Sequence, residues 1–463
     1  MREPGAILLV ACYELGHQPL AVAWPAAFLE RAGYRPGRLD VSVEPVDVHK
    51  LARARVIAIS VPMHTALRLG LEVAARARAV NAAAHICFFG LYATLNADHL
   101  FAHGSDSVIG GEAETPLLAL VAALERGETG PLPGVARPGQ PAAPYLKRLD
   151  FPVPSRAGLP SIKKYAHVER DGRMELAAYA EASRGCLHTC RHCPIPPVYG
   201  GRFFAVPREV VLADIGQQIE AGARHVTFGD PDFLNGPTHA LAVARALHAE
   251  WPDVTFDFTA KIEHLLRHRA HLSELARAGG LFVVSAAESL SDPVLAHLDK
   301  GHTRADIVTA LAATREAGLT LRPTWVAFTP WTTLDDHRAW LDFLAAEALI
   351  DHVDPVQYGL RLLVPPGSLL LETAALRPHL GPLEQATLSY RWTHPDPRMD
   401  RLQIETAQVV AQAVERKEDT PAIFDRVRAL AAAAAGAAAP VPVAPGMAKG
   451  RKRPPRLTEA WFC

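Results

Sequence analysis

The sequence has almost no excess charge, no long apolar run and few cysteines. Lysine and arginine together number 48, against 49 acidic residues, so the formal net charge is −1. A balanced charge of this kind argues against a nucleic-acid or anionic-membrane partner. No apolar run approaches the roughly 20 residues that a membrane helix needs. The short run at 6–12 has no small-residue cleavage site after it, and we interpret it as a buried strand rather than a signal peptide.

Six cysteines in 463 residues are too few for a disulfide framework in a chain of this size. Three of them lie within eight residues, in the stretch GCLHTCRHC that begins at Gly185. Such clustering indicates a reducing cytoplasm and a bound metal. The chain is too long for one ordinary core, so we expect two or three domains.

Apolar strands alternate with amphipathic helices near the start of the chain. This pattern predicts a doubly wound α/β domain over residues 1–126, with a parallel sheet and ligand-binding loops at the carboxyl ends of its strands. A segment rich in proline and glycine, 127–170, is predicted to be a linker. The predicted strands are 6–12, 56–63, 86–92 and 105–111.

A second strand–helix series predicts a partial or complete (β/α) barrel over residues 171–380. Residues 381–430 have a helical pattern. Residues 431–463 combine a low-complexity tether with a more specific end, LTEAWFC. The strands expected after the cysteine loop are 225–233, 254–261, 281–289, 319–328 and 354–364.

The cysteine spacing is Cys186-x3-Cys190-x2-Cys193. Three thiolates on one loop suit a [4Fe–4S] cluster in which one iron stays open to a non-protein ligand. The alternative is a zinc knuckle that His188 or His192 completes.

A CxxxCxxC motif at the end of a first barrel strand resembles the radical S-adenosylmethionine (SAM) superfamily. The resemblance implies that the open iron binds SAM and that an electron from the cluster cleaves a C–S bond of this cofactor. His192 stands where the family often has an aromatic residue. The family pattern further assigns to SAM binding the positions Gly229, Asp230, Asp232, Ser285, Glu288 and Arg322.

A doubly wound domain before such a barrel resembles the cobalamin-binding class of the superfamily. The turn IGGEAET suggests that Gly110, Gly111 and Glu112 approach cobalamin closely. The DxHxxG motif of base-off cobalamin binding is absent. DVHKLA (47–52) is a near miss that opens a helix, and His17 lies in the matching loop without the motif. Many proteins that this domain resembles lack the motif and leave the lower face of cobalamin without a protein ligand, so its absence does not exclude cobalamin. The alternative is a domain that only packs on the barrel.

The ending WFC resembles a subgroup of these proteins whose tails read Trp-Phe-Cys-(Cys or selenocysteine)-Ala-Glu-Pro. We therefore expect Cys463 to be a functional tail thiol. We also expect the gene to continue through an in-frame UGA codon for selenocysteine.

These patterns predict a cytoplasmic radical SAM enzyme, a transferase that acts on a small molecule. It would transfer a methyl group with cobalamin, or the 3-amino-3-carboxypropyl part of SAM to a soft element. An electron donor such as flavodoxin or ferredoxin would reduce the cluster. The alternative is a non-catalytic metal or redox-sensing module. A tRNA-modifying enzyme is disfavoured by the balanced charge.

Overall fold

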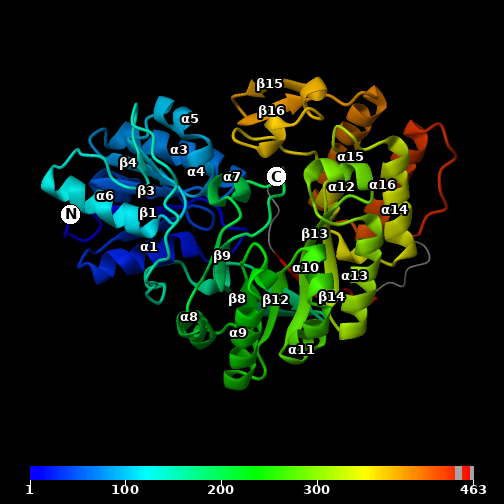
Figure 1. Ribbon diagram of the computed structural model, residues 1–463, viewed down its shortest axis with the longest axis horizontal. Helices are drawn as coiled ribbons and strands as arrows, with labels where there is room; N and C mark the ends of the chain where they lie inside the picture. The colour runs from blue at the N-terminus through cyan, green and yellow to red at the C-terminus, as the bar shows by residue number, and fades with distance from the viewer. Residues whose placement is uncertain (444–450, 459–463) are drawn as a thin grey trace.

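The computed structural model describes residues 1–443 and 451–458. Figure 1 shows an N-terminal domain, in blue and cyan, beside a larger body built on a second sheet. In the described residues, no helix has both the length and the apolar character needed to cross a membrane. Cys463 lies outside the described residues, so its role stays a prediction.

The N-terminal sheet has the strand order β2-β1-β3-β4-β5-β6, in which β6 alone is antiparallel to its neighbour. The strands β1, β3 and β5 are entirely buried, as expected when helices cover both faces. This arrangement confirms the predicted doubly wound domain. The strands are β1 Ile7–Ala11, β2 Gly37–Asp40, β3 Val56–Ser60, β4 His85–Phe89, β5 Ser107–Ile109 and β6 Val135–Ala136. The helices are α1 Leu20–Arg31, α2 Val48–Arg53, α3 His64–Val80, α4 Leu91–Leu95, α5 Ala97–Ala102 and α6 Glu114–Arg126.

Helix α1 joins the two bodies because it is apolar on two sides. Leu20, Trp24 and Phe28 are spaced four residues apart and belong to the core of the second body. Val22 and Ala26 repeat the same spacing on another side and pack in the N-terminal domain. Trp24 Nε1 also donates to Pro152 O at 3.1 Å, so α1 contacts the linker that leads to the second body.

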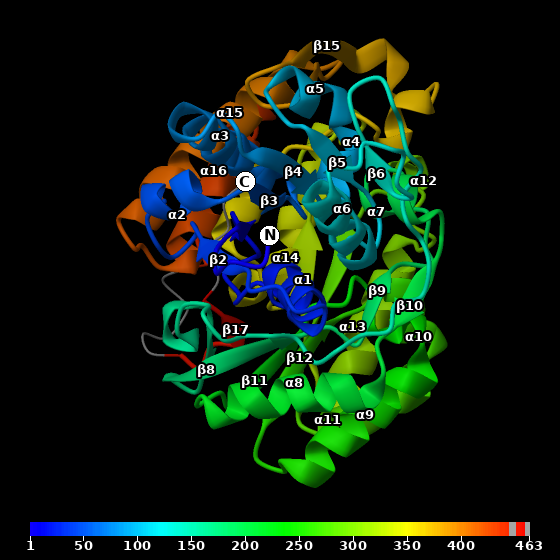
Figure 2. The ribbon, with the colours of Figure 1, turned by 90° about the vertical axis from the view of Figure 1, so that its left-hand side faces the viewer.

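The second sheet has the order β14-β13-β12-β11-β8-β7-β17. Its strands β8, β11, β12, β13 and β14 run parallel. It does not close on itself, which confirms the partial form of the predicted barrel. Helices α8, α9 and α11 cover its outer face (Figure 2). The strands are β7 His167–Arg170, β8 Arg173–Ala180, β11 His225–Phe228, β12 Thr255–Thr259, β13 Gly280–Glu288 and β14 Thr320–Trp325. The helices are α8 Arg208–Glu220, α9 Pro237–Glu250, α10 Ile262–Arg267, α11 Leu272–Arg277, α12 Asp292–Leu298, α13 Arg304–Ala317 and α14 Leu334–Ala346.

The last expected strand, 354–364, is wrong. Its first half is a 3₁₀ turn, Pro355–Gly359, and only Arg361 forms a bridge, to Phe328. Proline at the start of this stretch favours a helical turn, since its ring fixes φ and removes a donor. The region predicted as helical also contains a hairpin, β15 Leu380–Glu384 and β16 Ser389–Trp392, before α15 Pro397–Glu415 and α16 Thr420–Ala434.

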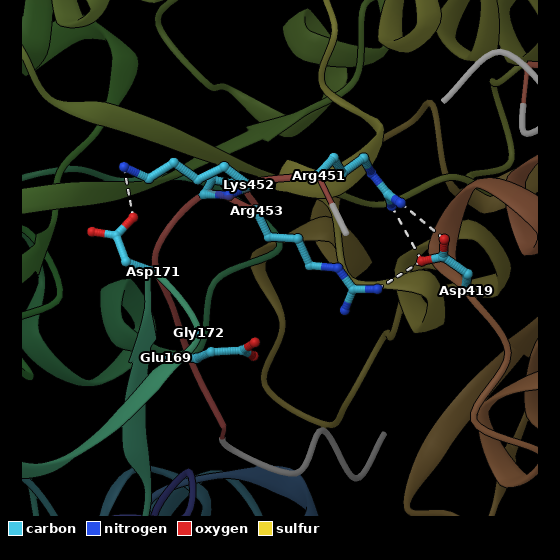
Figure 3. Close-up of a pocket in the computed structure, with 8 residues that line it drawn as sticks. Glu169, Asp171, Gly172, Asp419, Arg451, Lys452 and Arg453 are labelled. Carbon is cyan, nitrogen blue, oxygen red and sulfur yellow. Dashed lines mark hydrogen bonds and ion pairs between the residues drawn. The ribbon is translucent and has the colours of Figure 1, made fainter. Parts of the chain in front are cut away.

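The tail segment 451–458 returns to the edge of the barrel sheet. Its strand β17, Arg456–Leu457, pairs antiparallel with β7. Figure 3 shows Arg451 and Arg453 turned to Asp419, and Lys452 turned to Asp171. Arg451 also contacts Asp351 at 2.6 Å. Basic residues of the predicted tether are thus used in ion pairs within the chain.

Arg156 of the linker should be a large contributor to stability. It contacts Asp214 of α8 at 2.7 Å, with both side chains buried, and donates to Tyr179 O at 2.6 Å. Replacing Arg156 by alanine leaves the Asp214 carboxylate without its cation. We expect Arg156→Ala to lower the free energy of unfolding by about 3–5 kcal/mol, measured by urea denaturation followed through tryptophan fluorescence.

The matched control is Arg31→Ala, which removes an exposed ion pair to Asp150. The Arg31 side chain is 48% exposed and the Asp150 side chain is 94% exposed. We expect this variant to lose less than about 1 kcal/mol. Equal losses in the two variants would contradict the structural role of the buried pair.

Candidate functional site

The three cysteines lie in the loop that joins the two strands of a short hairpin between the two bodies (Figure 1). Strand β9, Ser183–Gly185, pairs antiparallel with β10, Phe203–Ala205, and Cys186 N donates to Arg202 O at 3.0 Å. Gly185 has φ +77°, and a Cβ there would lie 2.4 Å from Arg202 O, so only glycine fits. The loop ends at helix α7, Ile195–Tyr199.

The thiols are shielded from water. Cys186 and Cys190 are buried, Cys193 is half-buried, and all three are free. Burial raises the pKa of Cys186, and raises that of Cys193 to about 12. Cys186 and Cys193 are therefore protonated at neutral pH without a metal, and metal binding would release protons. Buried Lys300 lies close enough to Cys190 and Cys193 to interact electrostatically with both.

Two histidines of the cysteine loop are held by carboxylates from other strands. His192 Nε2 lies 3.0 Å from Glu288 Oε1, which also contacts Lys300 Nζ at 3.3 Å. Burial tends to raise the pKa of Glu288, but Lys300 and then His192 outweigh it and hold the value at about 2. Glu288 also has φ +64°, a strained conformation for this residue type. Glu288 thus supports the cysteine loop from the end of β13.

His188 turns instead to Asp232, which follows β11. His188 Nε2 lies 3.5 Å from Asp232 Oδ2, and His264 Nδ1 lies 2.8 Å from the same oxygen. Burial opposes ionisation of Asp232, yet hydrogen bonds from the two histidines lower its pKa. With His188 and His192 both engaged in this way, the geometry gives no support to a zinc knuckle completed by either.

Gly229 and Asp230 shape the turn after β11. A Cβ on Gly229 would lie 2.1 Å from the Tyr179 hydroxyl oxygen, so the ring occupies the space of a side chain. Asp230 accepts from Ala182 N at 2.9 Å and from Ser183 Oγ at 2.6 Å. Burial raises the pKa of Asp230 to about 7. Asp230 therefore fixes the start of the cysteine hairpin.

Two of the residues assigned to SAM binding lie away from the cysteine loop. Ser285 is two residues from both Val283 and Ala287, so the three side chains share one face of β13. Val283 and Ala287 belong to the apolar core, so this is the helix-covered face of the sheet. Its hydroxyl has no hydrogen-bond partner among the described residues. Arg322 lies in the middle of β14 and contacts Asp354 at 3.3 Å and Pro455 O at 3.5 Å. The carboxylate that Arg322 clamps in this structure is that of Asp354.

The turn at 110–112 makes close contacts within the chain itself. A Cβ on Gly110 would lie 2.1 Å from Thr94 Oγ1, and one on Gly111 would lie 2.4 Å from Tyr145 O. Glu112 is buried and contacts Arg184 at 3.0 Å. In this structure the groups that approach the two glycines closely are Thr94 and the linker residue Tyr145. Gly111 also borders a cavity, and the predicted contact of the turn with cobalamin stays a prediction.

This cavity lies where the carboxyl ends of the two sheets meet. Its volume is about 230 Å³, and it borders the ends of β1, β3, β4, β8 and β11. In the N-terminal sheet, β1 and β3 flank the point where the strand order reverses, the usual ligand site of such folds. The residues lining it are Glu14, Leu15, Ala21, Pro25, Ser60, Pro62, Met63, Phe89, Gly90, Leu91, Gly111, Ala113, Glu114, Tyr179, Glu181, Arg184, Gly185, Ile195, Tyr199, Gly229 and Pro231.

Sequence reasoning missed the charged group that borders this cavity. Arg184 contacts Glu114 at 2.7 Å, Glu112 at 3.0 Å and Glu181 at 3.1 Å. One cation thus faces three carboxylates, and burial raises the pKa of Glu181 to about 7. The signal was available, because Arg184 stands two residues before Cys186.

The near-miss motif at 47–52 and His17 are also accounted for. Asp47 caps α2, since its side chain accepts from His49 N and Lys50 N, as predicted for a helix start. The ring of His17 stacks on Tyr179 with centroids 4.5 Å apart. His17 thus packs between the two bodies.

Family models match both halves of this arrangement. Residues 6–121 match the B12 binding domain, and residues 181–339 match the radical SAM superfamily. One curated relative, the ribosomal protein uS12 methylthiotransferase RimO of Cereibacter sphaeroides, is 28% identical over 192 residues. That match covers 39% of this chain and only 41% of the relative.

Two solved structures share the fold over most of the chain. The cobalamin-dependent SAM radical enzyme OxsB with aqua-cobalamin bound has a TM-score of 0.71 at 14% identity, covering 88% of this chain and 67% of that one. The radical SAM methyltransferase TsrM of Kitasatospora setae, with tryptophan and a SAM analogue bound, has a TM-score of 0.60 at 18% identity. That match covers 74% of this chain and 71% of TsrM.

The cysteine loop thus lies in the part of the chain that matches the radical SAM superfamily. The chain combines this match with a match to the B12 binding domain, the pairing of domains that the sequence predicted. The radical SAM domain implies a [4Fe–4S] cluster and SAM, and the B12-binding domain implies a cobalamin site. The likeness of the tail to the Trp-Phe-Cys subgroup stays a prediction.

Glu14 at the cavity should make stability depend on pH. Burial, followed by repulsion from Glu181, raises its pKa from 4.5 to about 8. Between these values the folded chain binds more protons than the unfolded chain, so stability falls as pH rises. We expect Glu14→Gln to flatten this fall, by up to about 1.4 kcal/mol per pH unit, in urea denaturation between pH 4.5 and 9.

The variant should exceed the natural chain in stability at pH 8 to 9 and match it near pH 4.5. Glu3→Gln, at an exposed position far from the cavity, is the control and should leave the profile unchanged. Parallel profiles of Glu14→Gln and the natural chain would count against a buried, protonated Glu14.

Proposed function

We propose that the chain is a cobalamin-dependent radical SAM transferase that modifies a small molecule in the cavity between its two bodies. The observation that supports this most directly is that the cavity is bordered both by the cysteine hairpin, through Gly185, and by the carboxyl ends of the N-terminal strands. A substrate there would lie between the two cofactor sites that the family models imply.

The thiol side of this proposal rests on residues that fit a cluster. Cys186, Cys190 and Cys193 are free, shielded thiols on one loop, and Lys300 offers positive charge next to an anionic cluster. When bound, the cluster and SAM supply reductive C–S cleavage, and cobalamin supplies a transferable methyl group. The backbone around Gly229 remains the proposed SAM contact, together with the carboxylates of Asp230, Asp232 and Glu288 as supports of the loop.

The cobalamin side rests on the N-terminal edge of the cavity. Ser60 ends β3, Met63, Gly90 and Leu91 follow β3 or β4 within three residues, and all four line the cavity. The cavity is smaller than the roughly 300–1,000 Å³ of usual small-molecule sites, so a corrin ring would require a wider cleft. The apolar side chains that line the cavity would exclude water from the reacting groups.

The transferred group would be methyl, to an unactivated carbon or phosphorus, or 3-amino-3-carboxypropyl, to a soft element such as arsenic. The first is favoured by the B12-binding domain. The reductant would be a small redox protein such as flavodoxin or ferredoxin. Anaerobic incubation with SAM and dithionite, followed by mass spectrometry, separates the options, because 5′-deoxyadenosine and methylthioadenosine report cleavage of different C–S bonds.

Replacing the three loop cysteines by serine should remove the cluster. We expect iron to fall from about four per chain to near zero after anaerobic reconstitution, with loss of all SAM cleavage. The matched control is Cys12→Ser with Cys87→Ser, because these buried thiols lie in the N-terminal sheet, away from the loop. Full iron content or nucleoside release in the triple variant would refute the assignment.

A bulky side chain at the N-terminal edge of the cavity should block cobalamin. We expect the natural chain to bind about one hydroxocobalamin, and Met63→Trp to lose it because the indole fills the cavity next to Leu91 and Ile195. Visible absorbance after gel filtration measures the bound corrin. Met174→Trp makes the same change at an exposed site and should bind normally. Binding by both variants would place cobalamin elsewhere.

A further inference from the structure

Three potential metal-ligand atoms converge beside the cysteine loop. They come from His188 in the loop, Asp232 after β11 and His264 in α10. His264 Nδ1 and Asp232 Oδ2 are 2.8 Å apart, His188 Nε2 and Asp232 Oδ2 are 3.5 Å apart, and the two ring nitrogens are 3.4 Å apart. No family model or relative assigns a role to this triangle.

The triangle has the size of one face of a metal coordination sphere. A circle through its three corners has a radius of about 1.9 Å, so a point slightly above the plane lies about 2.1 Å from all three atoms, the usual bond length from zinc to nitrogen or oxygen. The side chains would thus need almost no movement to share one ion. Two imidazoles and one carboxylate with open positions suit Zn²⁺ or Fe²⁺.

Hydrogen bonding alone leaves this cluster poorly satisfied. If His264 Nδ1 donates its proton to Asp232, it has no lone pair to accept from His188. His188 Nε2 is then left with Asp232 Oδ2 at 3.5 Å, a long contact for a hydrogen bond. A cation would use one lone pair from each of the three atoms.

Backbone hydrogen bonds orient Asp232, and a second carboxylate lies near His188. Asp232 Oδ1 accepts from Leu234 N at 2.9 Å and Oδ2 accepts from Lys261 N at 3.2 Å, which leaves one lone pair of Oδ2 for an ion. His188 Nδ1 lies 3.7 Å from Glu263 Oε2, a carboxylate on the opposite side of the ring. Asp232 and His264 are buried, and the His188 side chain is 12% exposed, which gives an ion a path from solvent.

We propose that His188, Asp232 and His264 bind one divalent ion of the zinc or ferrous class, separate from the three cysteines. Because His188 lies between Cys186 and Cys190, the ion would tie the cysteine loop to β11 and α10. This inference goes beyond the proposed transferase function and does not depend on it.

The test is metal binding, independent of catalysis. The chain with all three loop cysteines changed to serine is titrated with Co²⁺ under anaerobic conditions. We expect about one Co²⁺ per chain, with d–d absorption and no thiolate-to-cobalt charge-transfer band. Adding His264→Ala should abolish binding, and Asp232→Asn should weaken it at least about 100-fold. His268→Ala, which removes a neighbouring histidine outside the triangle, should bind as before.

The reconstituted natural chain gives a second measurement that does not rely on the serine variant folding. Elemental analysis after incubation with Zn²⁺ and desalting should find one zinc beside the cluster iron, and Asp232→Asn should lose it. Circular dichroism checks that each variant is folded. Absence of zinc from the natural chain, or Co²⁺ binding that His264→Ala and Asp232→Asn leave unchanged, would overturn the proposal.

Discussion

The guanidinium of Arg184 links the two halves of the molecule at the cavity where their strands end. It contacts Glu112 and Glu114 from the N-terminal domain and Glu181 from the barrel, and it lies 4.3 Å above the Trp24 ring. A buried charge is tolerated only when it is paired and hydrogen-bonded. Arg184 stands two residues before Cys186, so the position of the cysteine loop depends on how the N-terminal domain docks.

Much of the fold was predictable because its strands are short, apolar and regularly spaced. The four strands expected in 6–111 and those expected in 225–328 all occur within a few residues of their predicted bounds. Sequence reasoning missed elements that are short or that interrupt another pattern. Strand β17 is two residues long and exists because β7 offers an open edge, and the hairpin β15–β16 interrupts a stretch with a helical pattern. Neither carries a strong local signal.

In the candidate site too, local features could be predicted from the sequence and contacts that depend on the fold could not. The cysteine spacing is local, so the loop could be read directly from the sequence. The roles of Ser285 and Arg322 depend on which face of a strand each side chain occupies, and a one-residue error in register reverses that face. Contacts between distant segments, such as His188 with Asp232 or Glu112 with Arg184, have no signature in a single sequence. Only the topology of the fold determines which distant residues come together in space.

The contacts around the cysteine loop pair buried carboxylates with histidines of the loop. His188 and His192 leave the loop on different sides and meet Asp232 and Glu288, which follow or end different strands of the same sheet. Each carboxylate is buried, so each needs a cationic or donor partner, and the loop histidines supply part of it. The loop is thereby fixed on two sides before any cluster is present. The cysteines that would hold a cluster are thus positioned by contacts with the sheet as well as by the eight-residue loop itself.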